Sequence, residues 1–243
     1  MPCYNAEKTV ARAIESILYQ TLKDFEFIII DDGSTDGTAD IISHYFRKDS
    51  RIKFAQNVKN INLAASLNRG IELAQSDLIV RMDADDENLP QRLKKQYEFL
   101  GSNPNIDVLG TNVFFIRNGK KVGESDLPLE NERVVEARYK RTFLIHPSVV
   151  IRKRTFAKFG QYDEKLPWAE DTDLWLRWLG RVNFANLKEP LLNYTVKTRI
   201  NFPIIYYNHY VLIKNMLRRS ELLKNFPLVV KSLFSHFLRL IKN

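Results

Sequence analysis

The chain has 243 residues, of which 44% are hydrophobic, and this is enough for one sizeable domain with its own core. Its single cysteine, Cys3, excludes an internal disulfide framework and is typical of a reducing cytosol. No apolar run approaches the roughly 20 residues of a membrane-spanning helix, and no signal peptide or internal repeat is visible. The net charge of +8 is uneven, because residues 202–243 carry +6 and residues 1–201 carry +2. This pattern indicates a near-neutral body with a basic tail.

The spacing of apolar residues predicts alternating helices and strands along the body. A helix is predicted over 7–19 with Asn5 as its N-cap, and the apolar run over 25–30 predicts a buried strand. The further predicted elements are a helix over 38–46, a strand over 52–55, a helix over 63–74, a strand over 78–82, a helix over 90–100, and a strand over 108–116 that returns through Val122 after an Asn118-Gly119 turn. This alternation predicts an α/β fold with a mixed, mainly parallel, Rossmann-like sheet flanked by helices.

Three carboxylates, Asp83, Asp85 and Asp86, directly follow the apolar strand over 78–82. Like charges at this spacing repel one another, so a fold keeps them together where something positive neutralises them. Divalent cations such as Mg²⁺ and Mn²⁺ take oxygen ligands and bridge protein carboxylates to substrate phosphates. A solvated acidic turn is the alternative interpretation. Because open α/β sheets bind ligands at the carboxyl ends of their strands, the position favours a metal site.

Five short motifs occur in an order that resembles a known enzyme family. They are Pro2-Cys3-Tyr4-Asn5-Ala6-Glu7, Asp31-Asp32-Gly33-Ser34-Thr35-Asp36, Arg81-Met82-Asp83-Ala84-Asp85-Asp86, His146-Pro147-Ser148 and Glu170-Asp171-Thr172-Asp173-Leu174-Trp175-Leu176-Arg177. Together they resemble a family 2 glycosyltransferase of the GT-A fold, similar to bacterial exopolysaccharide and lipopolysaccharide sugar transferases. The resemblance implies a GT-A domain over 1–201, followed by a basic helical tail over 202–243. It implies metal-dependent, inverting transfer of a hexose from a nucleotide sugar, in the first place a UDP-sugar, to a lipid-linked or surface-polysaccharide acceptor.

The resemblance also implies a nucleotide-sugar site that contains Tyr4, Glu7, Asp32, Asp83 and Arg81. Tyr4 would stack on the base, because an aromatic face suits any base. Asp32 would accept a hydrogen bond from uracil, and Asp83 would contact the ribose. Arg81 would pair with the neighbouring carboxylates or with the donor phosphates, and a plain surface arginine is the alternative.

For the chemical step, the resemblance implies that Asp85 and Asp86 hold the Mn²⁺ or Mg²⁺ ion and that Asp171 is the catalytic base. The base removes the proton of the acceptor hydroxyl as its oxygen attacks the anomeric carbon. The metal takes up charge on the leaving nucleoside diphosphate, so no covalent intermediate is required. Glu170 stands beside Asp171 at the predicted start of a helix, where an acid ordinarily stabilises the helix dipole.

Four further aromatic and imidazole side chains accompany these motifs. Trp168 would stack on an acceptor sugar or fill the core, whereas Trp175 and Trp178 are expected in the core. His146 is expected to support the site by packing or by a backbone hydrogen bond rather than to take part in the chemistry.

The chain departs from its relatives in three places. Relatives carry an apolar strand directly before the first motif, whereas this chain starts at Met1, and we expect a truncated or wrongly assigned start. Relatives often carry a metal-binding histidine a few residues past the equivalent of Tyr194. Here either Lys197 meets the diphosphate as a point charge or the site lacks a ligand. Processive members carry Gln-x-x-Arg-Trp, and Leu174 in place of Gln favours one sugar per acceptor encounter.

Apolar residues in the tail recur at spacings of three and four, with basic residues between them, both over 203–217 and over 226–241. This pattern is typical of basic amphipathic helices at membrane surfaces. The alternative is a helix packed on the catalytic domain with its lysines in water. No motif that reads nucleic acid accompanies the charge, so nucleic acid is not an expected partner. We therefore expect a cytoplasmic protein on the inner face of the cell membrane.

Two rival functions remain open from the sequence. A nucleotidyltransferase that makes nucleotide sugars would share the fold and the acidic metal site. It should carry a Gly-rich, basic phosphate loop after the first strand, and Tyr4-Asn5-Ala6-Glu7 differs from that pattern. The second rival is an inactive membrane-associated scaffold of the same fold.

Overall fold

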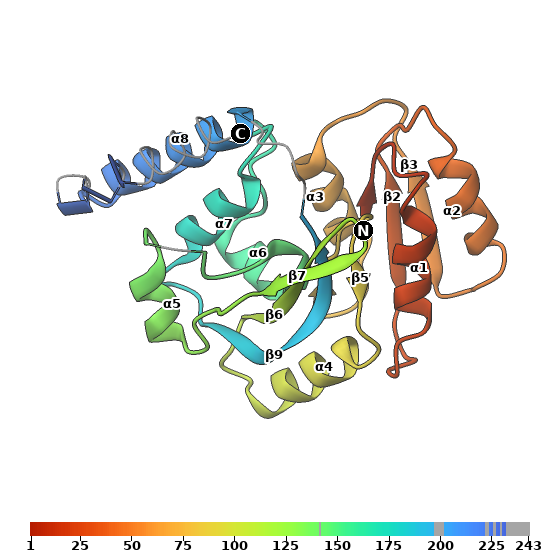
Figure 1. Cartoon of the computed structure of the whole chain (residues 1–243), viewed down its shortest axis with the longest axis horizontal. Helices are drawn as coiled ribbons and strands as arrows, with labels where there is room; N and C mark the ends of the chain where they lie inside the picture. Colours follow the sequence, from red (N-terminus) through yellow and green to blue (C-terminus); the bar gives the residue numbers. More distant parts are fainter. Residues whose placement is uncertain (141, 197–201, 222–223, 226, 229, 232–243) are drawn as a thin grey trace.

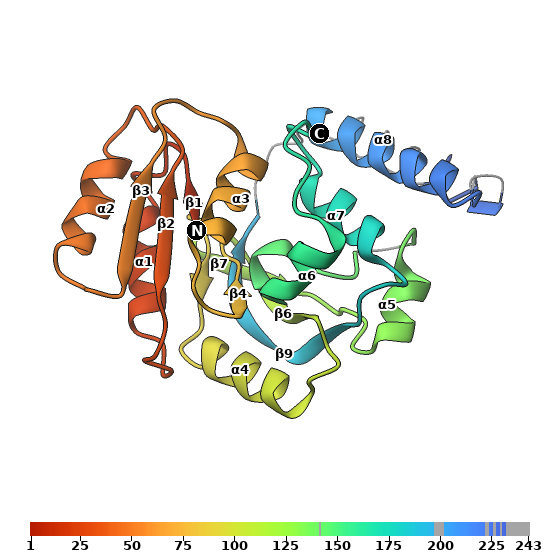
Figure 2. The same cartoon turned by 180° about the vertical axis from the view of Figure 1, so that it is seen from behind.

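A computed structural model describes residues 1–140, 142–196, 202–221, 224–225, 227–228 and 230–231. Its N-terminal part contains a parallel sheet with the strand order β1 (Pro2–Cys3), β2 (Phe27–Asp31), β3 (Ile52–Gln56). The connections contain α1 (Val10–Leu18) and α2 (Thr38–Phe46), and α3 (Leu63–Leu73) follows β3. Figures 1 and 2 show α1 on one face of this sheet and α3 on the other.

A second, six-stranded sheet has the order β4-β8-β6-β9-β5, with β7 on β6. Its strands are β4 (Leu78–Val80), β5 (Glu87–Asn88), β6 (Val108–Arg117), β7 (Lys120–Glu124), β8 (Val150–Arg152) and β9 (Phe184–Thr195). Only the β6–β9 pair is parallel here, whereas β4–β8, β6–β8, β6–β7 and β5–β9 are antiparallel. The mixed GT-A class is confirmed, but the sheet is less parallel than the strand–helix alternation predicts. The reason is that β4 pairs with β8, far along the chain, and not with a strand of the first sheet.

The remaining helices are α4 (Arg92–Ser102), α5 (Asn131–Ala137), α6 (Lys153–Phe159), α7 (Glu170–Trp178) and α8 (Phe202–Arg218), with a 3-10 turn, η1 (His146–Ser148). The predicted Asn118-Gly119 hairpin is confirmed, since both residues have the positive φ that this turn requires. The prediction that Asn5 caps α1 is wrong. The N-cap is Thr9, and Asn5 has a φ of 48° and accepts a hydrogen bond from the Thr35 N–H at 2.9 Å.

Two main apolar clusters support the two sheets. The first surrounds β1–β3 and includes Ile14 of α1, Ile29 of β2 and Ile42 of α2. The larger one packs α3, α6 and α7 on the second sheet and includes Trp175 and Trp178. Both tryptophans are therefore core residues, as predicted, and each large buried apolar side chain contributes about 1.5–3 kcal/mol to stability.

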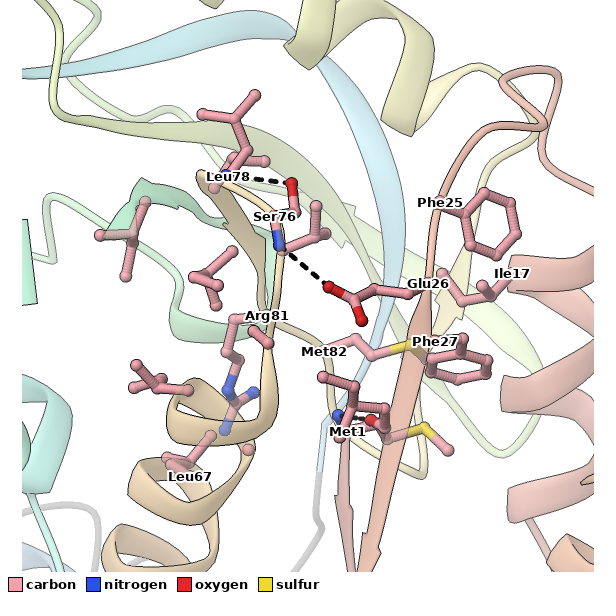
Figure 3. Close-up of a pocket in the computed structure, with 18 of the residues that line it drawn as sticks. Met1, Ile17, Phe25, Glu26, Phe27, Leu67, Ser76, Leu78, Arg81 and Met82 are labelled. Atoms are coloured by element: carbon pink, nitrogen blue, oxygen red, sulfur yellow. Dashed lines mark hydrogen bonds between the residues drawn. The ribbon is translucent and has the colours of Figure 1, made fainter. Parts of the chain in front are cut away.

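An apolar cavity of about 410 Å³ lies between the sheets (Figure 3). Phe27 and Ile28 of β2, Leu78 of β4 and Leu67 of α3 line it. The Met1 nitrogen lies at its border and donates a hydrogen bond to the Ile28 carbonyl at 2.8 Å, and burial lowers the pKa of this ammonium group to about 6. β2 and β4 belong to different sheets, and residues of both strands line this cavity. The expectation of an apolar strand before the first motif stays a prediction.

The C-terminal helix α8 packs against α7, at the end of the molecule remote from α2 in both views (Figures 1 and 2). The apolar stripe predicted over 226–241 lies for the most part outside the described residues. Within the part of the chain that the structure describes, no helix is long and apolar enough to cross a membrane. The division into a domain over 1–201 and a tail over 202–243 stays a prediction.

Candidate active site

The turn after β4 brings the three predicted carboxylates together. Ligand oxygens of Asp83, Asp85 and Asp86 all lie within 4.8 Å of one another. Asp86 is buried, with 1% of its surface exposed, whereas Asp83 and Asp85 are half-buried and accessible from one side. The cluster therefore has the spacing that a shared divalent cation needs.

Residues from two distant elements hold this turn in place. Thr195, the last residue of β9, donates from its N–H to Asp86 Oδ1 at 2.8 Å and from Oγ1 to the Asp85 carbonyl at 2.6 Å. Arg12 of α1 donates to the same Asp85 carbonyl at 3.0 Å. Thr195 directly follows Tyr194, so the residue that makes these two hydrogen bonds lies two positions before Lys197. Lys197 lies outside the described residues.

The chemistry of Asp86 fits a bound cation. Its Oδ2 atom is buried and has no hydrogen-bond partner among the described residues. Burial and the charge of Asp83 raise the pKa of Asp86 to about 8. A buried carboxylate oxygen without a partner is costly, and a divalent ion would satisfy it and favour its charged form. The donor set is oxygen only, which suits Mg²⁺ and Mn²⁺.

Arg81 is a buried cation at the centre of this acidic region. Only 5% of it is exposed, and its Nη1 atom lies 2.6 Å from Asp83 Oδ2. The alternative of a plain surface arginine is therefore wrong. Its charge lowers the pKa of Asp86, Glu170 and Asp171, against the opposing effect of burial. One guanidinium thus favours the ionised form of several carboxylates.

The predicted base lies on the first turn of α7. Asp171 Oδ1 accepts hydrogen bonds from the Thr172 N–H at 2.7 Å and from Thr172 Oγ1 at 3.3 Å. Burial raises the pKa of Asp171 in spite of these bonds, and it raises the pKa of Glu170 to about 7, with the charge of Asp171 as the second cause. Ala169, immediately before the pair, has a φ of 62°, which costs a non-glycine residue about 1–2 kcal/mol. The strained backbone and the raised pKa values mark a poised acidic pair.

His146 lies behind this pair, in the supporting position that the sequence predicts. Its Nε2 atom is 2.8 Å from the Tyr162 hydroxyl, and its Nδ1 atom is 3.8 Å from Glu170 Oε1. Burial and the charge of Arg81 lower the pKa of His146 well below its usual value, so the ring is neutral. Trp175 packs edge-on against the ring. Trp168, for which the sequence leaves stacking and core positions open, is partly exposed.

The proposed nucleotide residues line the end of the first sheet. Tyr4 follows β1 and is half exposed. Asp32 is buried and its Oδ1 atom accepts from Asn57 Nδ2 at 2.7 Å and from the Ile61 N–H at 2.9 Å. Glu7 accepts the Gly37 N–H at 3.0 Å, so it secures the loop after β2.

A glycine is required in that loop. Gly33 has a φ of 70°, and a Cβ atom there would lie 2.6 Å from the backbone of Lys59. Cys3, at the end of β1, lies between this loop and the acidic turn. The thiol of Cys3 has a pKa raised to about 12, mainly by burial, and the charges of both Asp31 and Asp83 add to the effect. The loop after β2 and the acidic turn both lie next to β1, because Cys3 of β1 pairs with Asp31 and packs in one apolar cluster with Met82 and Ala84.

Sequence reasoning missed one buried charge beneath the site. Arg92 of α4 is fully buried and donates to the Arg81 carbonyl at 2.8 Å and to Gln96 Oε1 at 3.0 Å. It thereby anchors the end of β4 from which the acidic turn starts. An arginine at the start of a helix is ordinarily exposed, so the local pattern carried no signal for this contact.

Comparisons with known proteins agree with this arrangement. Residues 1–160 match the family model described as Glycosyl transferase family 2. An uncharacterized glycosyltransferase of Methanocaldococcus jannaschii is 36% identical over 208 residues, which are 83% of this chain and 71% of that protein. The O-antigen biosynthesis glycosyltransferase WbnJ of Escherichia coli is 34% identical over 204 residues, which are 82% of this chain and 79% of that protein.

Solved structures share the fold. S. aureus TarS 1-349 in complex with UDP-GlcNAc superposes with a TM-score of 0.71 at 20% identity, over 88% of this chain and 65% of that chain. The mannosyltransferase PcManGT from Pyrobaculum calidifontis, in complex with GDP-Man and Mn²⁺, has a TM-score of 0.66 at 14% identity, over 96% of this chain and 72% of that chain. The family match and the relatives above 30% identity show that the chain belongs to glycosyl transferase family 2 and is a glycosyltransferase of the GT-A fold.

Proposed function

We propose that the chain is a metal-dependent, inverting glycosyltransferase that uses a nucleotide-sugar donor, in the first place a UDP-sugar. The observation that carries the proposal is the approach of Asp83, Asp85 and Asp86 to within 4.8 Å, with the buried Oδ2 of Asp86 lacking a partner among the described residues. The raised pKa values of Glu170 and Asp171 on α7 add an acidic pair suited to proton transfer.

On the donor side, each proposed residue has a distinct task. Tyr4 would stack on the base, and Asp32 would accept from its ring with the oxygen that its own hydrogen bonds leave available. Glu7 would act indirectly, by holding the loop at Gly37. Asp83 would contact the ribose while Arg81 balances its charge. The UDP-GlcNAc bound to TarS and the GDP-Man bound to PcManGT support a nucleotide sugar as the ligand class.

On the metal side, Asp85 and Asp86 would hold Mn²⁺ or Mg²⁺. The ion would supply positive charge next to the diphosphate leaving group. The Mn²⁺ bound to PcManGT supports this assignment. Thr195 would orient both ligands through its contacts with Asp85 and Asp86.

On the acceptor side, we assign Asp171 as the base that removes the proton of the attacking hydroxyl. The Thr172 N–H and hydroxyl fix one oxygen of its carboxylate, which leaves the other for the acceptor. The relative named for O-antigen biosynthesis supports a lipid-linked or polysaccharide acceptor. With the basic C-terminal part, this acceptor supports a position on the inner face of the cell membrane.

The test is release of nucleoside diphosphate from a panel of UDP- and GDP-sugars, with Mn²⁺, with Mg²⁺ and with chelator. Asp85→Ala should lose metal-dependent donor binding, whereas Asp171→Asn should bind donor and metal but lower transfer by about 10²- to 10⁴-fold. Asp40→Asn, an exposed acid of α2, is the matched control. Near-normal turnover of Asp171→Asn would contradict the base assignment. Absence of turnover with every donor would favour the inactive scaffold.

A further inference from the structure

Helix α8 holds both ends of the helix that carries Asp171. At the start of α7, the Thr172 hydroxyl lies 3.0 Å from Asn208 Oδ1 of α8 and 3.3 Å from Asp171 Oδ1, so these two acceptors compete for its one proton. At its end, Arg219 donates to the carbonyls of Leu176 at 2.8 Å and Leu179 at 2.7 Å. Helix α8 and Arg219, the residue directly after it, are therefore bonded to both ends of α7, and one of these contacts is at Thr172, next to the acidic pair.

The opposite side of α8 is exposed and has a mixed aromatic and basic character. Its outer face consists of Tyr206, Tyr210, Lys214, Leu217 and Arg218, which recur at helical spacing. The exposed fractions of Tyr206, Tyr210 and Leu217 are 65%, 45% and 59%. Large apolar and aromatic side chains exposed in a row beside cations are unusual on a surface that contacts water alone.

The acids near this face do not neutralise it. Glu221, the one acid between residues 202 and 231, bonds to Arg138 at 3.1 Å and to the Tyr139 hydroxyl at 3.0 Å. Asp163 approaches Lys214 at 4.0 Å, and an exposed pair at that distance contributes little. The outer face therefore keeps a positive charge.

We propose that the outer face of α8 docks flat on an anionic lipid bilayer. Tyr206 and Tyr210 would lie at the headgroup level, where aromatic rings with a polar end are favoured, and Leu217 would enter the acyl boundary. Lys214 and Arg218 would attract the anionic headgroups with their flexible side chains. The contacts with α7 then place the acidic pair at a set distance from the membrane. The inference deepens the proposed function, because such docking brings a lipid-linked acceptor to the site.

The experiment is flotation of the purified chain with vesicles of 30% phosphatidylserine in phosphatidylcholine at low and high salt. The double variant Lys214→Gln/Arg218→Gln should lower the partition coefficient by roughly 25-fold at low salt, as expected for the loss of two basic charges. Its matched control is Arg47→Gln/Lys48→Gln, which removes two exposed cations at the end of α2, remote from α8. The control should bind like the unaltered chain.

A second pair of variants tests the aromatic part. Tyr206→Ser/Tyr210→Ser should lose the binding that persists at high salt, because that remainder is apolar. Its control, Tyr19→Ser/Phe46→Ser, removes aromatic rings that are 75% and 47% exposed elsewhere. Melting temperatures should change by only a few degrees, because the rings of Phe46, Tyr206 and Tyr210 contact Phe54 or Tyr207 at the surface. Release of nucleoside diphosphate without vesicles should stay unchanged in all four variants, so a failed docking and a failed transferase assignment are distinguishable.

The proposal is overturned if the unaltered chain stays with the lipid-free fraction on anionic vesicles at low salt. It is also overturned if both controls lose binding as strongly as the α8 variants, since binding would then follow total charge. Equal binding to neutral vesicles would exclude the role of Lys214 and Arg218.

Discussion

Replacing Arg81 with methionine tests whether one buried cation sets the ionisation of the site. The change keeps an unbranched apolar stem but removes the charge that lies 2.6 Å from Asp83 Oδ2. That charge lowers the pKa of Glu170 and of Asp171, so its loss must raise both values. Because a base acts in its ionised form, less of Asp171 would be active at neutral pH, and the acid limb of the rate profile must move to higher pH.

The size of the effect follows from the charge. An opposite charge near a carboxyl favours its ionised form, so the loss of that charge raises the pKa of the carboxyl. At a pH below the new pKa, each unit lowers the rate about tenfold. The rate at pH 7 should therefore fall by roughly tenfold or more and recover as the pH rises. Stability should change by less than about 2 kcal/mol, because Asp83 is partly exposed and regains water while the burial cost of the guanidinium is removed.

The assay is kcat/KM for sugar transfer from pH 5 to 10, together with urea unfolding. The matched control is Arg154→Met, which removes an exposed arginine paired with Asp107 at 3.3 Å. This variant should keep the acid limb of the unaltered enzyme. If Arg81→Met lowers the rate by one factor at every pH, Arg81 contacts the donor rather than tuning the base, and the electrostatic reasoning fails.

Three further substitutions have clear expected results. Gly110→Ala should lower the free energy of unfolding by about 3 kcal/mol in urea, because the new Cβ would lie 2.1 Å from Asn186 Oδ1 and displace the two buried hydrogen bonds of that side chain. Gly101→Ala should raise it by about 0.5–1 kcal/mol, because this glycine lies in a helix and a Cβ atom there meets open space. Thr195→Val should weaken Mn²⁺ binding about tenfold in calorimetry, because it removes the 2.6 Å bond to the Asp85 carbonyl. Unchanged affinity would show that the acidic turn keeps its conformation without this bond.

Local patterns predicted the elements that depend on local forces. The helix predicted over 38–46 is found as α2 with the same bounds. Its apolar spacing and its start after Gly37 are properties of one short segment, so they can be read from the sequence of that segment alone. The Asn118-Gly119 hairpin is another case, since its turn needs two residues that tolerate positive φ. The acidic cluster after β4 was predictable because a strand end is a recognisable place in an α/β chain.

Contacts between distant segments were not predictable in the same way. The apolar run that forms β4 suits a parallel or an antiparallel neighbour equally, so its pairing with β8 was not encoded locally. The burial of Arg81 and Arg92 depends on which strands cover them. The bond from Thr195 to the acidic turn joins residues more than one hundred positions apart, and a threonine carries no pattern for such a role.

Two parts of the structure border the acidic pair on α7: the buried charge of Arg81 and the helix α8. Arg81 acts on Glu170 and Asp171 through charge inside the protein, where salt screens little. Helix α8 contacts Thr172, next to Asp171, through Asn208, and its outer face is exposed. The two influences should separate experimentally. Arg81→Met should move the pH profile and leave vesicle binding unchanged, whereas Lys214→Gln/Arg218→Gln should weaken vesicle binding and leave the pH profile in place. A variant of either kind that changed both readouts would mean that membrane docking itself alters the ionisation of Asp171.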